Sequence, residues 1–139
     1  MRVTLLSLCL LLLPGCALLS GPDAERAWVD LQSAADNRLL AVELDGSPWS
    51  AWSRSYFRLA PGAHQLAVRY HFDVNPRDIG GDTPHRRDCR LTLDYHDFSP
   101  GQRYRLQAGQ HGFRPWVRLY DPYDRLVARG AEQGCRSGG

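Results

Sequence analysis

Apolar and polar residues alternate most regularly between residues 64 and 72. Leu66, Val68, Tyr70 and Phe72 occupy every second position, and mostly polar residues stand between them. Because successive side chains of a strand point to opposite faces, a period of two indicates a strand with one buried face. The segment therefore predicts a β-strand over 64–72 whose apolar side lies in a core.

The same alternation recurs along most of the chain. It predicts further strands at 40–45, 56–59, 89–96, 103–108, 116–120 and 126–128. The clearest turn signals between them are Asp45-Gly46, Pro61-Gly62, Pro100-Gly101 and Asp121-Pro122. Residues 73–88 are polar and contain two prolines and two glycines, which indicates a long loop. Residues 27–34 fit either a first strand or a short helix.

No segment places apolar residues at helical spacing over three turns. About seven short strands, with turn signals at intervals of roughly 8–16 residues, are typical of an all-β domain. We predict a small antiparallel β-sandwich, with a curled antiparallel sheet as the alternative arrangement.

The first 15 residues have the composition of a bacterial signal peptide. Arg2 precedes an apolar run from Leu5 to Leu13, which is far shorter than the ~20 residues that span a bilayer. The run ends in Leu-Pro-Gly before Cys16 and Ala17, which resembles the lipobox of bacterial lipoproteins. This resemblance implies cleavage before Cys16 and a lipid on its sulfur. Ordinary secretion, with cleavage after Ala17, is the alternative.

On this interpretation the chain has three parts. Residues 1–15 are the signal peptide, residues 16–25 are the lipidated cysteine and its tether, and residues 26–139 are one folded domain. Ala17 would be the second residue of the mature chain, where Asp favours retention in the inner membrane. We therefore expect an anchor in the outer membrane, with the domain facing the periplasm.

Two cysteines remain after Cys9 leaves with the signal peptide and Cys16 takes the lipid. Cys89 and Cys135 form an even pair in an oxidising compartment, which favours a disulfide. Such a bond would close a loop of about 46 residues and stabilise the fold by roughly 3–4 kcal/mol. Metal binding is the alternative, although neither cysteine stands in the CxxC or CxxH spacing of zinc sites.

Composition and charge narrow the class of protein. The chain has 139 residues, of which 43% are hydrophobic and 23% charged, as in globular domains. Its basic residues are all arginine, and the net charge is only +2. The arginines are scattered among the acids, whereas nucleic-acid-binding proteins show basic stripes or high net charge. We expect no nucleic-acid partner.

The sequence offers little catalytic or metal-binding chemistry. It contains no GxSxG or SxxK motif, and its five histidines form neither HxH nor HExxH. His71 and His96 would bind a metal only if their strands brought them together; exposed strand histidines are commoner. The loop at 73–88 carries oxygen ligands for calcium at Asp73, Asn75, Asp78 and Asp82, but not in EF-hand spacing. We predict no enzyme, no metal and no cofactor.

One candidate binding surface consists of Trp49, Trp52, Arg54, Trp116 and Tyr120. Tryptophan, tyrosine and arginine are favoured in binding hot spots, so these residues suit a platform for a glycan or a protein. Trp116 and Tyr120 belong to it if Val117 and Leu119 face the core. The alternative is that the two tryptophans of the 49–54 loop cap one end of the sandwich.

Two segments carry a family resemblance. Val42-Glu-Leu-Asp45-Gly46, followed by Phe57-Arg-Leu-Ala-Pro61-Gly62-Ala-His64-Gln-Leu-Ala-Val68, resembles the PEGA-like module, a small β-sandwich of bacterial surface proteins. With the lipobox and the later Pro100-Gly101 strand, the layout is similar to small uncharacterised lipoproteins of Gram-negative bacteria. The resemblance implies a PEGA-like or transthyretin-like sandwich in the envelope and supplies no catalytic residue.

These observations favour a membrane-anchored envelope lipoprotein. We expect a non-catalytic interaction or structural module whose partner is an envelope protein or a glycan. The alternative from another class is an envelope enzyme or a metal- or ligand-binding accessory protein.

Overall fold

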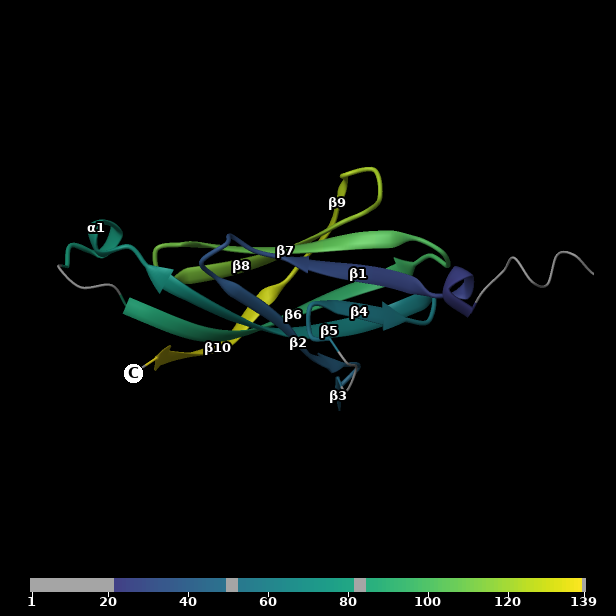
Figure 1. The fold of residues 1–139 in the computed structure, drawn as a ribbon, viewed down its shortest axis with the longest axis horizontal. Helices are drawn as coiled ribbons and strands as arrows, with labels where there is room; N and C mark the ends of the chain where they lie inside the picture. Colours follow the sequence, from purple (N-terminus) through teal and green to yellow (C-terminus); the bar gives the residue numbers. More distant parts are fainter. Residues whose placement is uncertain (1–21, 50–52, 82–84, 139) are drawn as a thin grey trace, which may run out of the picture.

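The computed structural model describes residues 22–49, 53–81 and 85–138, and their fold is all-β, as the alternation predicts (Figure 1). The elements in chain order are η1 (Pro22–Glu25), β1 (Ala27–Gln32), β2 (Arg38–Leu44), β3 (Ser47–Pro48), β4 (Tyr56–Leu59), β5 (Gly62–Val74), α1 (Pro76–Ile79), β6 (His85–Phe98), β7 (Arg103–His111), β8 (Arg114–Tyr120), β9 (Leu126–Arg129) and β10 (Ala131–Gly138).

The strands form two five-stranded sheets with the core between them. The first sheet has the order β4-β1-β7-β8-β9, and the second has the order β10-β6-β5-β2-β3. In Figure 1, β7 and β8 of the first sheet are drawn above β6 of the second. Neighbouring strands are antiparallel apart from β1 and β7, which run parallel. The predicted sandwich is therefore confirmed, with one parallel pair inside it.

Strands β5 and β6 form a long hairpin at the centre of the second sheet. Their pairing runs from Gly62 opposite Phe98 to Val74 opposite His85. The four apolar residues at alternate positions of 66–72 are all at most 1% exposed. The strand predicted over 64–72 is confirmed and is longer at both ends.

The loop predicted over residues 73–88 is shorter than expected. Asp73 and Val74 still belong to β5, where they pair with Arg86 and His85 of β6. Val74 is buried, and the Arg86 guanidinium donates to the Asp73 carboxylate at 3.1 Å. These contacts keep both ends of the predicted loop in the hairpin, although the polar sequence there shows no clear alternation. The Asn75 side chain then caps the N-terminus of α1.

The described part of the chain contains more strands than the seven or so expected. Residues 27–32 are strand β1, since Ala27 and Val29 are buried at alternate positions. The tail from Ala131 shows little alternation, yet it forms β10 at the edge of the second sheet. Pairing with β6, rather than a buried face of its own, makes this segment a strand.

The chain crosses from the first sheet to the second at Gly130, between β9 and β10. A Cβ atom at this position would lie 2.2 Å from Cγ1 of Val117 and 2.5 Å from the carbonyl oxygen of Thr92. Both distances are far inside van der Waals contact. The crossing is therefore close enough to both sheets that only glycine fits.

One buried tyrosine carries polar chemistry into the core. The Tyr70 ring is fully buried, its hydroxyl donates to Oε1 of Gln110 at 2.5 Å, and it accepts from Nδ2 of Asn37 at 2.9 Å. Burial raises the pKa of this phenol, although the hydrogen bond from Asn37 opposes the shift. The three side chains join the two sheets through a hydrogen-bonded link.

A disulfide joins Cys89 of β6 to Cys135 of β10, as the cysteine count predicts. The two residues lie directly opposite each other in the antiparallel pair. Cys89 is fully buried, and Cys135 is half-buried. The bond therefore fastens an edge strand to the centre of its sheet. Among the described residues, no helix is long and apolar enough to cross a membrane.

Candidate functional site

Strand β8 turns Trp116 and Tyr120 to the outside of the first sheet. Val117 and Leu119 are 1% and 0% exposed, so the residues that alternate with them face outward. Trp116 and Tyr120 therefore have the outward orientation that was predicted for them if Val117 and Leu119 face the core.

Strand register brings further rings and arginines to the same outer face. Trp28 of β1 lies opposite Arg58 of β4 on one side and Arg103 of β7 on the other. The two guanidinium carbons lie 5.7 Å and 5.6 Å from the indole centroid. Tyr56 lies beside the same indole, with ring centroids 5.2 Å apart. The indole therefore has an arginine neighbour from each adjacent strand and an aromatic neighbour from β4.

The β7–β8 half of the face repeats this arrangement. The Arg105 guanidinium lies 4.9 Å from the Tyr120 ring centroid, and that of Arg118 lies 4.3 Å from the Trp116 ring. Trp116 lies flat over Gly109, where an added Cβ would come within 2.2 Å of the indole. We call these residues of β1, β4, β7 and β8, with Arg114 and Arg129 beside them, the arginine–aromatic face.

Positive charge dominates the arginine–aromatic face. By strand alternation its outward positions include the arginines Arg58, Arg103, Arg105, Arg114, Arg118 and Arg129. Asp30 is the one acid at an outward position of these strands within the described residues. Asp124, from the β8–β9 turn, is a second acid and accepts from Arg105 at 2.8 Å. Six arginines that are scattered in the sequence thus gather on this face.

The ion pairs and ring contacts fix the positions of the guanidinium groups. Arg103 donates to both carboxylate oxygens of Asp30, at 2.6 Å and 3.1 Å, and this hydrogen bond raises the pKa of Arg103. Cation–π contacts contribute about 0.5–1 kcal/mol each at exposed sites, and a stacked guanidinium keeps its N–H edge available. The face therefore presents ordered N–H donors, while the stacked arginines cover much of the surface of its aromatic rings.

Trp49 and Arg54 lie elsewhere in the fold. Trp49 packs against the core, with its ring centroid 5.2 Å from that of buried Phe57, and its indole N–H donates to the carbonyl of Ser53 at 3.3 Å. Arg54 is exposed in the segment before β4. Because β8 is three strands away from β4, these residues do not join Trp116. Trp52 and Cys16 lie outside the described residues.

The histidines do not assemble a metal site on the second sheet. His71 lies opposite Asp88, while His96 lies eight positions farther along β6. Eight positions of a strand span about 26 Å, so these rings remain far apart. In the described part of the chain, one group has metal-site geometry, formed by Cys89, Glu132 and Cys135. Its two sulfurs are bonded to each other and therefore offer no thiolate.

The calcium ligands proposed on the polar loop have other roles. Asp73 pairs with Arg86 within the β5–β6 hairpin, and the Asn75 side-chain oxygen accepts from the backbone N–H of Arg77. Asp82 lies outside the described residues. The part of the loop that is described thus uses these oxygens for local structure.

The Asp-Gly and Pro-Gly-Ala-His segments meet at a His–Asp pair. Nδ1 of His64 lies 2.5 Å from Oδ2 of Asp45, and its Nε2 lies 2.6 Å from the carbonyl oxygen of Ala60. Partial burial acts to raise the pKa of Asp45, but the hydrogen bonds from the Gln65 N–H and from His64 outweigh it and lower that pKa. Both ring nitrogens lie within hydrogen-bond distance of oxygen acceptors, so the imidazole links the two turns.

Comparison with known proteins returned no matching family model, no similar curated protein and no similar solved structure. The candidate site therefore stands on its geometry. Sequence reasoning missed Trp28, Tyr56 and the arginines of β4 and β7 because their gathering depends on which strands are neighbours. Alternation alone places them on outward positions without indicating that they share a face.

Proposed function

We propose that this protein is a lipid-tethered, non-catalytic interaction module of the bacterial cell envelope that binds an acidic glycan. The arginine–aromatic face carries the proposal, because it combines many ordered guanidinium groups with only two acids. Guanidinium groups recognise carboxylate, sulfate and phosphate groups through paired N–H donors.

A glycan suits this face better than a protein partner. Stable protein interfaces have an apolar centre that becomes fully buried. Here the stacked arginines cover the rings, and the large hydrophobic residues that are well exposed in the described part of the chain are Phe113, Tyr123 and Leu126. Phe113 and Tyr123 lie in the turns that flank β8, and Leu126 lies beside the arginine–aromatic face, opposite Tyr120 in the β8–β9 pairing. One leucine does not form the apolar centre of a protein interface. An acidic polymer requires charge complementarity and hydrogen bonds, and the face supplies both.

The location in this proposal rests on the N-terminal sequence and the disulfide. Leu13-Pro-Gly before Cys16 resembles a lipobox, and Ala17 favours delivery to the outer membrane. The disulfide between Cys89 and Cys135 suits an oxidising compartment such as the periplasm. In this arrangement a lipid on Cys16 holds the sandwich near the membrane, and the sandwich itself is of the PEGA-like type.

Affinity measurements with defined polymers test the proposed function. The full chain in detergent should bind alginate and heparin, should not bind neutral dextran, and should lose affinity as salt rises because salt screens exposed charges. Replacing Arg103, Arg105 and Arg118 together by Gln should weaken binding at least about 100-fold, since hydrogen bonds to charged groups contribute roughly 1.5–3 kcal/mol each.

The matched control is Arg77→Gln, which removes one charge from exposed α1 and should leave the affinity unchanged. The triple variant should fold normally, because exposed ion pairs contribute only about 0–1 kcal/mol. Equal affinity for double-stranded DNA and the acidic glycans would contradict a glycan-specific role, as would an affinity that the triple variant retains.

A further inference from the structure

A hollow lined by arginine lies on the outer face of the second sheet, away from the arginine–aromatic face. It has a volume of about 230 Å³ between β5, β6 and the edge strand β10. The side chains of Arg69, Asp88, Arg90, Gln133 and Arg136 line it, together with the chain at Gly134 and Cys135. The volume is below the roughly 300 Å³ at which drug-sized pockets begin, so it suits one small group and its hydration water.

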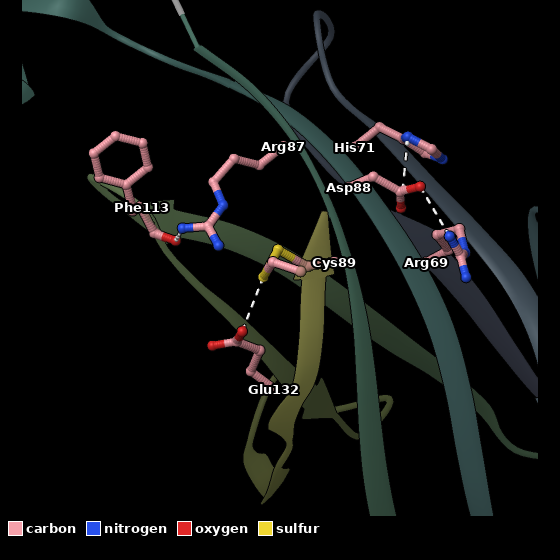
Figure 2. The surroundings of a disulfide bond; sticks show 8 residues. Arg69, His71, Arg87, Asp88, Cys89, Phe113 and Glu132 are labelled. Carbon is pink, nitrogen blue, oxygen red and sulfur yellow. Dashed lines mark hydrogen bonds and ion pairs between the residues drawn. A yellow bond between two sulfur atoms is a disulfide. The ribbon is translucent and has the colours of Figure 1, made fainter. Parts of the chain in front are cut away.

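Two of the three arginines are held in place by acids. Arg69 donates to Oδ2 of Asp88 at 2.8 Å, and Arg90 donates to Oε2 of Glu43 at 2.6 Å. Figure 2 shows Asp88 between Arg69 and His71, while Arg87 reaches away from them toward Phe113. Each guanidinium has five N–H donors and spends one in these bonds, so most donors remain for a ligand.

The third arginine closes the hollow without an internal partner. Arg136 lies opposite Asp88 in the β6–β10 pairing and therefore on the same face. It is exposed and makes no hydrogen bond or ion pair with the described residues. Among the described residues, Asp88 lines the hollow and Glu43 holds Arg90 beside it, so three positive charges face two negative charges.

We propose that this hollow binds a phosphate group carrying close to two negative charges, as in inorganic phosphate or a phosphate monoester. A phosphate group offers three acceptor oxygens to guanidinium groups from three strands, whereas a carboxylate offers only two. Side chains from three strands converge on the hollow, and the side chains of Arg69 and Arg90 are 32% and 35% exposed. Partial removal from water strengthens their attraction for an anion. The site is independent of the glycan-binding role.

Phosphate titration of the full chain tests this site. Addition of inorganic phosphate should shift the arginine Nε–H NMR signals of Arg69, Arg90 and Arg136. Arg136→Gln should weaken phosphate binding about ten-fold through loss of charge-assisted hydrogen bonds, and it should not disturb the fold because this side chain has no internal partner. Arg77→Gln, which lies outside the hollow, should bind phosphate as the unaltered chain does.

Vesicles distinguish the two sources of the phosphate. Binding of inorganic phosphate that depends on Arg136 supports a site for the free anion. Binding only to phosphatidylcholine vesicles that contain phosphatidic acid, again dependent on Arg136, supports a lipid headgroup as the ligand. The proposal is overturned if neither probe binds, or if Arg136→Gln and Arg77→Gln behave alike.

Discussion

Removal of the disulfide is the sharpest perturbation of the fold. Cys89 and Cys135 are 46 residues apart, and the bond between them restricts the unfolded chain over that whole distance. In the chain-entropy model a loop of this length contributes about 4 kcal/mol to the free energy of unfolding. For a domain of this size, that is a large part of the ~5–15 kcal/mol that separates folded from unfolded protein.

The location of the bond adds a local prediction. Strand β10 is at the edge of the second sheet and pairs there with β6. Without the crosslink, β10 should open before the remaining strands, and its amide protons should exchange with solvent faster than those of the β5–β6 hairpin.

Denaturant unfolding of the full chain measures the effect in three forms: oxidised, reduced, and with both cysteines replaced by Ala. The reduced and substituted forms should each lose roughly 3–4 kcal/mol relative to the oxidised form. The substituted form is also the control, because the reductant should not change its stability. A reduced form within about 1 kcal/mol of the oxidised one would refute this reasoning.

Other substitutions test single contacts. Gly130→Ala should destabilise the fold by about 1–3 kcal/mol in denaturant unfolding, because the new methyl group overlaps both sheets; an unchanged midpoint would contradict the tight crossing. Tyr70→Phe should cost about 1–3 kcal/mol, since Gln110 loses its donor, and an unaffected melting temperature would show that water replaces the hydroxyl. Trp49→Ala should lower stability by about 2–3 kcal/mol without changing glycan affinity, whereas lost affinity at full stability would make Trp49 part of a binding surface. Burial acts to raise the pKa of Asp121, but hydrogen bonds from Arg125 and from a backbone N–H outweigh burial and lower that pKa. The Asp121 carboxylate should therefore stabilise the fold fully above the unfolded pKa of about 3.9, and this stabilisation should disappear as pH falls below that value. Unfolding measured from pH 5 to 2 should therefore show a weaker pH dependence in Asp121→Asn, and identical profiles would exclude this carboxylate as a source of acid sensitivity.

The fold class was predictable because it depends on local alternation. Leu66, Val68, Tyr70 and Phe72 indicate a buried strand face without knowledge of its neighbours, and the Asp121-Pro122 signal does mark the β8–β9 turn. The tail strand β10 was not predictable, because it is stabilised by pairing with β6 and shows little apolar periodicity.

The candidate site was predictable only in part for the same reason. Outward positions for Trp116 and Tyr120 follow from Val117 and Leu119, which alternate with them. That Trp28 lies between Arg58 and Arg103 follows from the antiparallel β1–β4 pairing and the parallel β1–β7 pairing, and no local pattern specifies either neighbour. The segregation of charge on this face likewise appears only once the strand order is known.

The central claim is that an acidic glycan binds at the arginine–aromatic face, and an NMR footprint on the full chain tests it most directly. Addition of alginate should shift the arginine Nε–H signals of Arg103, Arg105 and Arg118 and the indole N–H signal of Trp28, while the Arg77 signal stays in place. Signals that stay in place on this face while others in the molecule move would contradict the account.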